Sequence, residues 1–123
     1  MARATINVQA LDERNKFAAA ALSADMTTAI DATDGAEIVW SERDDKYMVL
    51  IQNANASGAK NVTIKAGNGI QGVNDITFSI AASSYTFIAL DSGRFKNVVG
   101  ADKGKVLFTG DSADIKIAAF KMP

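Results

Sequence analysis

Short strand-like segments separated by turn signals dominate the chain from Met26 onward, and this spacing restricts the fold more than any other feature. Lys60 to Lys65 alternates Val62 and Ile64 with polar residues, which is the period-two pattern of a half-buried strand. Ile76 to Ile80 alternates in the same way. About eight such segments, with turns every 8–12 residues, are typical of a sandwich or a small barrel. The sequence therefore predicts an all-β fold.

Two segments of this region are predicted to be buried on both faces. Tyr47 to Ile51 is the longest run of large apolar residues, is too short for a typical helix, and predicts a central strand. Ser84 to Leu90 also carries apolar residues on both faces, with Tyr85 and Phe87 on one of them. We expect a single antiparallel β-sandwich, immunoglobulin-like or jelly-roll-like, over residues 26–123.

Turn residues divide the predicted strands. Asp31 to Gly35 begins with an Asx side chain that can bond the backbone and ends with a glycine that accepts positive φ, so it predicts a tight turn. Asn53 to Ala59 is expected to be a loop. After a turn that begins at Asp91, the segment from Arg94 to Val99 is expected to form a short edge segment.

The first 25 residues differ from the rest and are interpreted as an N-terminal arm or a loosely docked segment. Thr5 to Val8 is compatible with a short strand. Leu11 to Leu22 is rich in alanine and predicts about three helical turns with Asp12 as N-cap. Because Phe17 and Leu22 are its only large apolar residues after Asp12, such a helix is marginal unless it packs on something.

The chain contains no His and no Cys, which excludes disulfides, thiolate nucleophiles and the commonest general base and transition-metal ligand. Thirteen basic and fourteen acidic residues alternate along the chain and give a net charge of -1, so a nucleic-acid partner is not expected. No membrane-spanning run and no secretory signal are recognised. We expect synthesis in the cytoplasm, no membrane association and no cofactor.

Gly67, Gly69 and Gly72 match the G-x-G-x-x-G spacing that holds a pyrophosphate against a helix N-terminus. The residues from Val73 to Phe78 are strand-like, however, so no helix is expected to follow. We interpret the motif as a flexible or bulged loop.

Acidic residues near the predicted turns are the candidates for metal or catalytic groups. Asp31 and Asp34 are separated by Ala32 and Thr33 and lack the alternating ligands of a calcium loop, so a turn is favoured over a metal site. The carboxylates at strand ends show no spacing that selects a catalytic pair: Glu37, Glu42, Asp44 and Asp45. We predict no catalytic residues and no enzyme.

Large aromatic and cationic side chains are the candidates for partner binding. Trp40 is interpreted either as an exposed interface anchor or as an ordinary strand residue. Arg94 and Phe95 follow a turn and have the composition of an interface hot spot, although Phe95 could instead cap the core. Arg3 and Phe17 are the corresponding candidates in the arm.

Four stretches resemble small proteins encoded beside the major capsid gene in tailed phages and prophages: Ile30–Ala36, Val49–Asn53, Val62–Gly72 and Leu90–Phe95. The likeness covers residues 26–120. It implies a capsid decoration protein, also called a cement or auxiliary head protein, that binds the exterior of an expanded head and clamps neighbouring capsomers. The implied partner is the major capsid protein, and the implied location is the capsid exterior of the virion.

Two other functions stay open from the sequence. A host-facing carbohydrate-binding or adhesion sandwich would need several exposed aromatics, whereas the one Trp, two Tyr and six Phe lie mostly at apparent core positions. A hydrolase would depend on unpaired carboxylates alone. Self-association, for example as a trimer, is compatible with either binding function because an exposed strand edge invites pairing.

Overall fold

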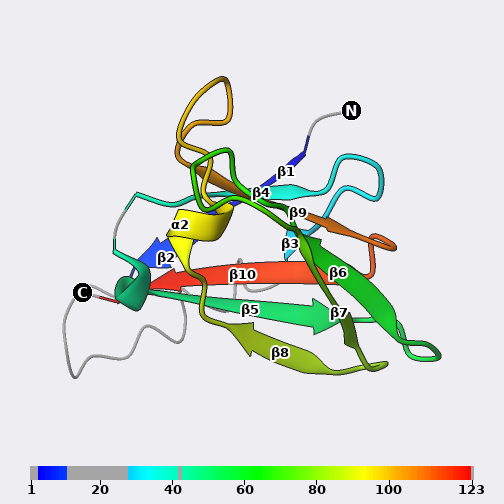
Figure 1. The fold of residues 1–123 in the computed structure, drawn as a ribbon. Helices are drawn as coiled ribbons and strands as arrows, with labels where there is room; N and C mark the ends of the chain where they lie inside the picture. The colour runs from blue at the N-terminus through cyan, green and yellow to red at the C-terminus, as the bar shows by residue number, and fades with distance from the viewer. Residues whose placement is uncertain (1–2, 11–27, 42, 123) are drawn as a thin grey trace.

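The structure is a computed structural model that describes residues 3–10, 28–41 and 43–122. Two β-sheets pack against each other, so the predicted all-β sandwich is confirmed (Figure 1). In spatial order, sheet A contains β1 (Ala4–Ile6), β4 (Ala36–Val39), β9 (Lys105–Gly110), β6 (Lys60–Ile64) and β7 (Ile76–Ile80). Sheet B contains β2 (Val8–Ala10), β10 (Ile115–Lys121), β5 (Tyr47–Asn53) and β8 (Tyr85–Ile88), and β3 (Thr28–Ala29) also pairs with β10.

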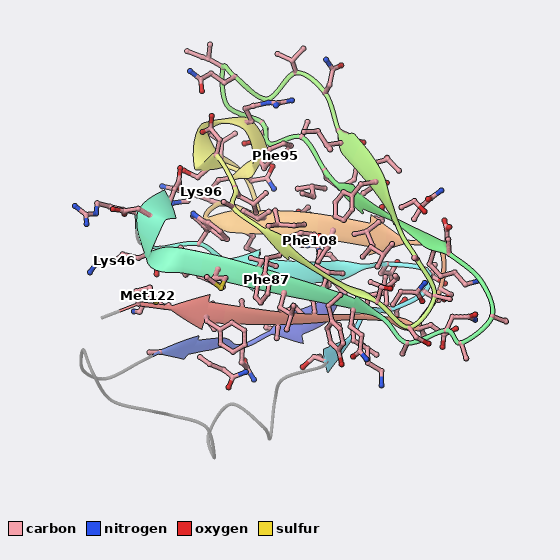
Figure 2. All side chains as sticks on the ribbon, turned by 90° about the horizontal axis from the view of Figure 1, so that it is seen from below. Lys46, Phe87, Phe95, Lys96, Phe108 and Met122 are labelled. Carbon is pink, nitrogen blue, oxygen red and sulfur yellow. The ribbon has the colours of Figure 1, made fainter. Side chains whose placement is uncertain are left out.

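Alternating apolar side chains fill the space between the sheets. In β9, Val106 and Phe108 are completely buried while the intervening Leu107 is half-buried, as a strand with one face on a core requires (Figure 2). Burial of an apolar side chain of this size stabilises the folded state by about 1.5–3 kcal/mol. The other large side chains of the core that are fully buried are Trp40, Ile38, Ile51, Ile115, Ile117, Val49 and Val62.

The two strands expected to be buried on both faces behave differently. β5 is an inner strand of sheet B, between β10 and β8, and its Val49 and Leu50 point to opposite faces yet are both buried, although Met48 is 43% exposed. The prediction for β8 is wrong, because Tyr85 is 56% and Phe87 is 63% exposed. β8 is the last described strand of sheet B, so side chains of a neighbouring strand flank its outward-facing rings on one side only.

The turn between β3 and β4 forms as the sequence predicts. The Oδ1 atom of Asp31 accepts hydrogen bonds from the backbone N–H groups of Thr33 and Asp34, at 2.9 and 2.8 Å. Gly35 has a φ of 81°, and a Cβ there would lie 1.9 Å from the carbonyl oxygen of Phe108. Glycine is therefore needed both for the backbone conformation and for the close approach to β9.

A buried asparagine anchors the loop that follows β5. The side chain of Asn53 is completely buried, and its Nδ2 donates to the carbonyl oxygens of Gly58 and Ile80, each at 3.0 Å. Its Oδ1 accepts from the backbone N–H of Asn55 at 2.9 Å. The amide is thus satisfied inside the protein and ties the loop to the end of β7.

Two short helical turns interrupt the strands. The 3-10 turn η1 (Asp44–Lys46) precedes β5, and α2 (Ser92–Phe95) stands where an edge segment beginning at Arg94 was expected. The side chain of Asp91 caps α2 by accepting from the N–H of Gly93. Only Lys96 keeps an extended pairing, as an isolated bridge to Val106.

The beginning of the chain belongs to the sandwich. β1 pairs in parallel with β4 in sheet A, and β2 pairs in parallel with β10 in sheet B, so the chain passes from one sheet to the other at Asn7. Residues 4–10, which the sequence analysis placed in an arm, therefore close one side of the fold, and the sheets are mixed where purely antiparallel ones were expected. The helix predicted over Leu11 to Leu22, which includes Phe17, lies outside the described residues.

Candidate functional site

Trp40, a candidate interface anchor, belongs to the core. It is 1% exposed, its ring centroid lies 4.2 Å from that of Tyr47, and its Nε1 donates to Asp44 Oδ1 at 3.0 Å. Burial by itself would raise the pKa of the Asp44 carboxyl, but the hydrogen bond from the backbone N–H of Ser92, together with the one from Trp40, lowers it. Trp40 therefore directly follows β4, packs inside the sandwich and offers no exposed ring to a partner.

Phe95 is also interior, whereas Arg94 stays accessible. Phe95 is 4% exposed and closes the core beneath α2, which was the alternative weighed for it (Figure 2). The guanidinium carbon of Arg94 lies 4.9 Å from the centroid of the Phe95 ring, in the range of a cation–π contact. The two residues are thus neighbours, but only Arg94 can meet a partner.

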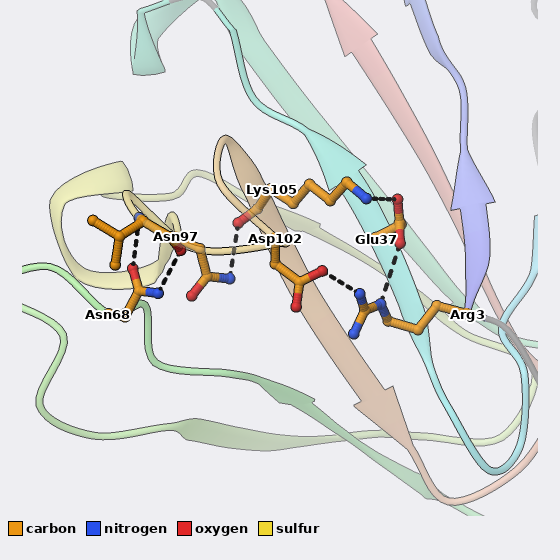
Figure 3. Close-up of polar contacts among 7 residues, drawn as sticks. Arg3, Glu37, Asn68, Asn97, Asp102 and Lys105 are labelled. Carbon is orange, nitrogen blue, oxygen red and sulfur yellow. Dashed lines mark hydrogen bonds and ion pairs between the residues drawn. The ribbon is translucent and has the colours of Figure 1, made fainter.

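Arg3 is held in an ion-pair network on sheet A (Figure 3). Its Nε lies 3.2 Å from Glu37 Oε1, its Nη2 contacts Asp102, and Lys105 Nζ lies 2.9 Å from Glu37 Oε2. The hydrogen bond from Lys105, assisted by Arg3 and opposed by burial, lowers the pKa of Glu37. Arg3 therefore fastens the N-terminal segment to β4, and its charge is already satisfied within the chain.

A group of exposed aliphatic side chains lies in two loops at one end of the sandwich. The segment before β7 carries Ile70 and Val73, which are 102% and 74% exposed, and the segment after α2 carries Val98 and Val99, which are 47% and 60% exposed. We call these four residues the loop end. Sequence reasoning missed them, although an isoleucine between Gly69 and Gly72 is an apolar residue in a turn context and gave a usable signal.

Asn68 holds the two loops of the loop end together (Figure 3). Its Oδ1 accepts from the N–H of Val98 at 2.7 Å, and its Nδ2 donates to the carbonyl oxygen of Val99 at 2.9 Å. Asn68 therefore ties the segment that carries Ile70 to the one that carries the two valines.

The glycines of the G-x-G-x-x-G motif allow the backbone segments of the loop end to pack closely. A Cβ on Gly67 would lie 2.4 Å from the carbonyl oxygen of Lys96, and a Cβ on Gly72 would lie 1.9 Å from that of Gly67. The next element is β7, so the helix N-terminus that a pyrophosphate site requires does not follow the motif. The interpretation as a loop is confirmed, and the glycines permit close backbone contacts.

The acidic candidates are engaged in structural contacts. Asp31 bonds its own turn, Glu37 pairs with Arg3 and Lys105, and Glu42 lies outside the described residues. Within the described ranges, no cluster of three or more acidic side chains is arranged to hold a metal ion. The same part of the chain contains no helix that is long and apolar enough to span a membrane.

Comparisons of this chain with family models, with curated proteins and with solved structures found no match. Functional inference therefore depends on the chain's own surfaces. The loop end is the main candidate for an interaction surface, because exposed clusters of large aliphatic side chains commonly mark interaction sites.

Proposed function

We propose that this protein is a non-enzymatic structural protein that binds the outer surface of a phage capsid and stabilises contacts between major capsid protein subunits. The observation that carries the proposal is the loop end, where four aliphatic side chains project from loops that Asn68 fastens together. In this proposal the loop end contacts the capsid, and the protein lies on the exterior of the virion.

Ile70, Val73 and Val99 expose apolar area to water. Transfer of this area into an interface is favourable by about 25 cal/mol per Å². Because the loops are tied before binding, less conformational entropy is lost on association than for free loops. Presentation of many copies on a symmetric shell would add avidity to contacts that are individually weak.

The test is co-sedimentation of the recombinant protein with mature, expanded heads, together with measurement of their resistance to heat and low salt. Ile70→Asp and Val99→Asp should each weaken binding at least tenfold, since a charge would be buried in the interface. Val39→Asp, at a valine that is 49% exposed on β4, is the matched control and should bind normally. Normal binding by both loop-end variants, or no binding of the wild-type protein, would refute the proposal.

Deletion of residues 1–25 is unsuitable for this test. It would remove β1 and β2 from the two sheets along with the rest of the segment, so a loss of binding would report loss of the fold. Point substitutions in the loop end leave every strand intact.

A carbohydrate-binding or adhesion function is the second candidate, and the exposed aromatics of β8 favour it. Tyr85 and Phe87 are two residues apart, point to the same face of sheet B and are more than half exposed. Aromatic rings of this kind can stack on the apolar faces of sugars. A glycan array with a hit that is lost in Tyr85→Ala and kept in Ile70→Asp would favour this function over capsid binding.

A further inference from the structure

One side of the sandwich is open between the last strands of the two sheets. Among the described residues, β7 pairs only with β6, and β8 pairs only with β5 (Figure 1). A groove of about 590 Å³ runs between them, with Ile76 and Phe78 on one wall, Thr86 and Ile88 on the other, and Leu90 and Phe95 among its lining. We call this groove, with its two strand edges, the open side.

The walls of the groove are core-type side chains that lack a cover among the described residues. Ile76 pairs with Ile64 and shares its face, yet Ile64 is 3% exposed and Ile76 is 37% exposed. Phe78 pairs in the same way with the fully buried Val62 and stays only partly buried. The core therefore extends into the groove, and an apolar occupant would complete its packing.

The edge of β8 presents backbone hydrogen-bonding groups to the open side. The N–H of Asn53 donates to the carbonyl oxygen of Ser84, which fixes the phase of the antiparallel ladder between β5 and β8. Hydrogen-bonded pairs alternate with non-bonded pairs in such a ladder, so Tyr85 and Phe87 direct their backbone N–H and C=O groups away from β5. These groups can pair with an added strand.

Neither edge strand carries a charge that would oppose pairing. The sequence from Ile76 to Leu90, which includes both strands and their connection, contains no charged residue and no proline. Edge strands are commonly protected by such residues because unpaired edges attract other chains. The composition of the open side thus favours strand addition.

A cation lies at one end of the groove. Arg94 lines it, its guanidinium lies over the ring of Phe95, and it forms no ion pair with any described residue. The nearby carboxylate of Asp91 accepts from the N–H of Gly93 and caps α2. Arg94 is therefore available for a carboxylate of an occupant.

We propose that the open side binds an extended, acidic segment of a partner protein, which pairs with the edge of β8, places apolar side chains into the groove and sets a carboxylate beside Arg94. The molecule already closes its other side in this manner, since the segment from Ala4 to Ala10 extends along both sheets there. A fatty acid would suit the apolar walls and Arg94 but would leave the backbone groups of Tyr85 and Phe87 unpaired. This inference is independent of the capsid proposal.

The test uses the isolated ¹⁵N-labelled full chain and an acetylated hexapeptide with one terminal glutamate followed by alternating valine and threonine. Titration should shift the amide resonances of β8, slow the solvent exchange of the Tyr85 and Phe87 amides, and shift the resonances of Arg94. Arg94→Gln should weaken binding about tenfold, which corresponds to loss of one charge-assisted contact. Lys103→Gln makes the same charge change outside the groove lining and should leave the affinity unchanged.

Two control ligands decide between strand addition and simple filling of the groove. A hexapeptide with proline at its third position cannot donate to the β8 edge there and should bind at least tenfold more weakly. Equal binding of this peptide, no binding of the first, or binding of decanoate that displaces it without slowing the β8 amides would each overturn the inference. Because no capsid is present, these outcomes are separate from failure of the capsid proposal.

Discussion

The two sides of the sandwich differ in how their sheets end. On one side, residues 4–10 pair with sheet A through β1 and with sheet B through β2, so one segment joins both layers. On the other side, β7 and β8 are also consecutive in the chain and belong to different sheets, but a groove remains between them. Connection between the sheets is thus not enough to close a sandwich; the segment must also place large side chains into the gap.

The polar contacts sharpen this difference. On the closed side, Arg3 is fixed by Glu37 and Asp102, and its partner Glu37 is also held by Lys105. On the open side, Arg94 has no ion pair with a described residue. The closed side therefore pairs its cation within the chain, whereas the guanidinium of Arg94 on the open side has no carboxylate partner among the described residues.

The largest expected effect is that of Ile6→Ala on the closed side. Ile6 is 2% exposed and pairs with the completely buried Ile38, so its truncation leaves a cavity. We expect a loss of about 2–4 kcal/mol in the free energy of unfolding, measured by urea denaturation. A loss below about 1 kcal/mol would show that the N-terminal segment does not close the core.

Glu37→Gln should have an intermediate effect that depends on pH. Because the pKa of Glu37 is lowered in the folded state, its carboxylate adds stability above its unfolded pKa of about 4.3, and this is lost as the pH falls through the folded value. We expect the free energy of unfolding to fall by about 1–2 kcal/mol at neutral pH, and this loss to shrink as the pH is lowered through the folded-state pKa of Glu37, measured by urea unfolding over a series of acidic pH values. Asp45→Asn removes a well-exposed ion pair with Arg43 and should cost almost nothing.

Ile76→Ala is the matched change on the open side and should have a smaller effect. Its side chain faces the groove and is 37% exposed, so truncation creates little new cavity. We expect a loss of about 1 kcal/mol or less by the same urea measurement. A loss as large as that of Ile6→Ala would mean that the two sides are equally closed.

Tyr85→Lys should change the stability least and the solubility of heated protein most. The side chain is 56% exposed on an edge strand, so the free energy of unfolding should change by no more than about 0.5 kcal/mol. A lysine on this edge should reduce aggregation after heating, measured by light scattering. Thr5→Lys, at an exposed position of the closed side, is the control, and an equal reduction there would argue against a special role of the β8 edge.

The sequence by itself determined the local features of this protein. Alternation predicted β6 and β7, the Asp31–Gly35 turn formed as its residue types require, and the strand after the glycine motif argued correctly for a loop. These features depend on contacts within a few residues or on period-two patterning, so they are visible in one segment at a time.

Only the tertiary structure decided which of the two faces of each segment is covered. Tyr85 and Phe87 are exposed although their local pattern predicted burial, and Asn53 is buried at the end of β5 although it was expected to begin a loop. Trp40, for which the sequence left both outcomes open, is buried. The loop end and the open side likewise arise from segments distant in the chain. Period-two alternation separates the faces of a strand, but coverage of a face depends on neighbours that are specified elsewhere in the sequence.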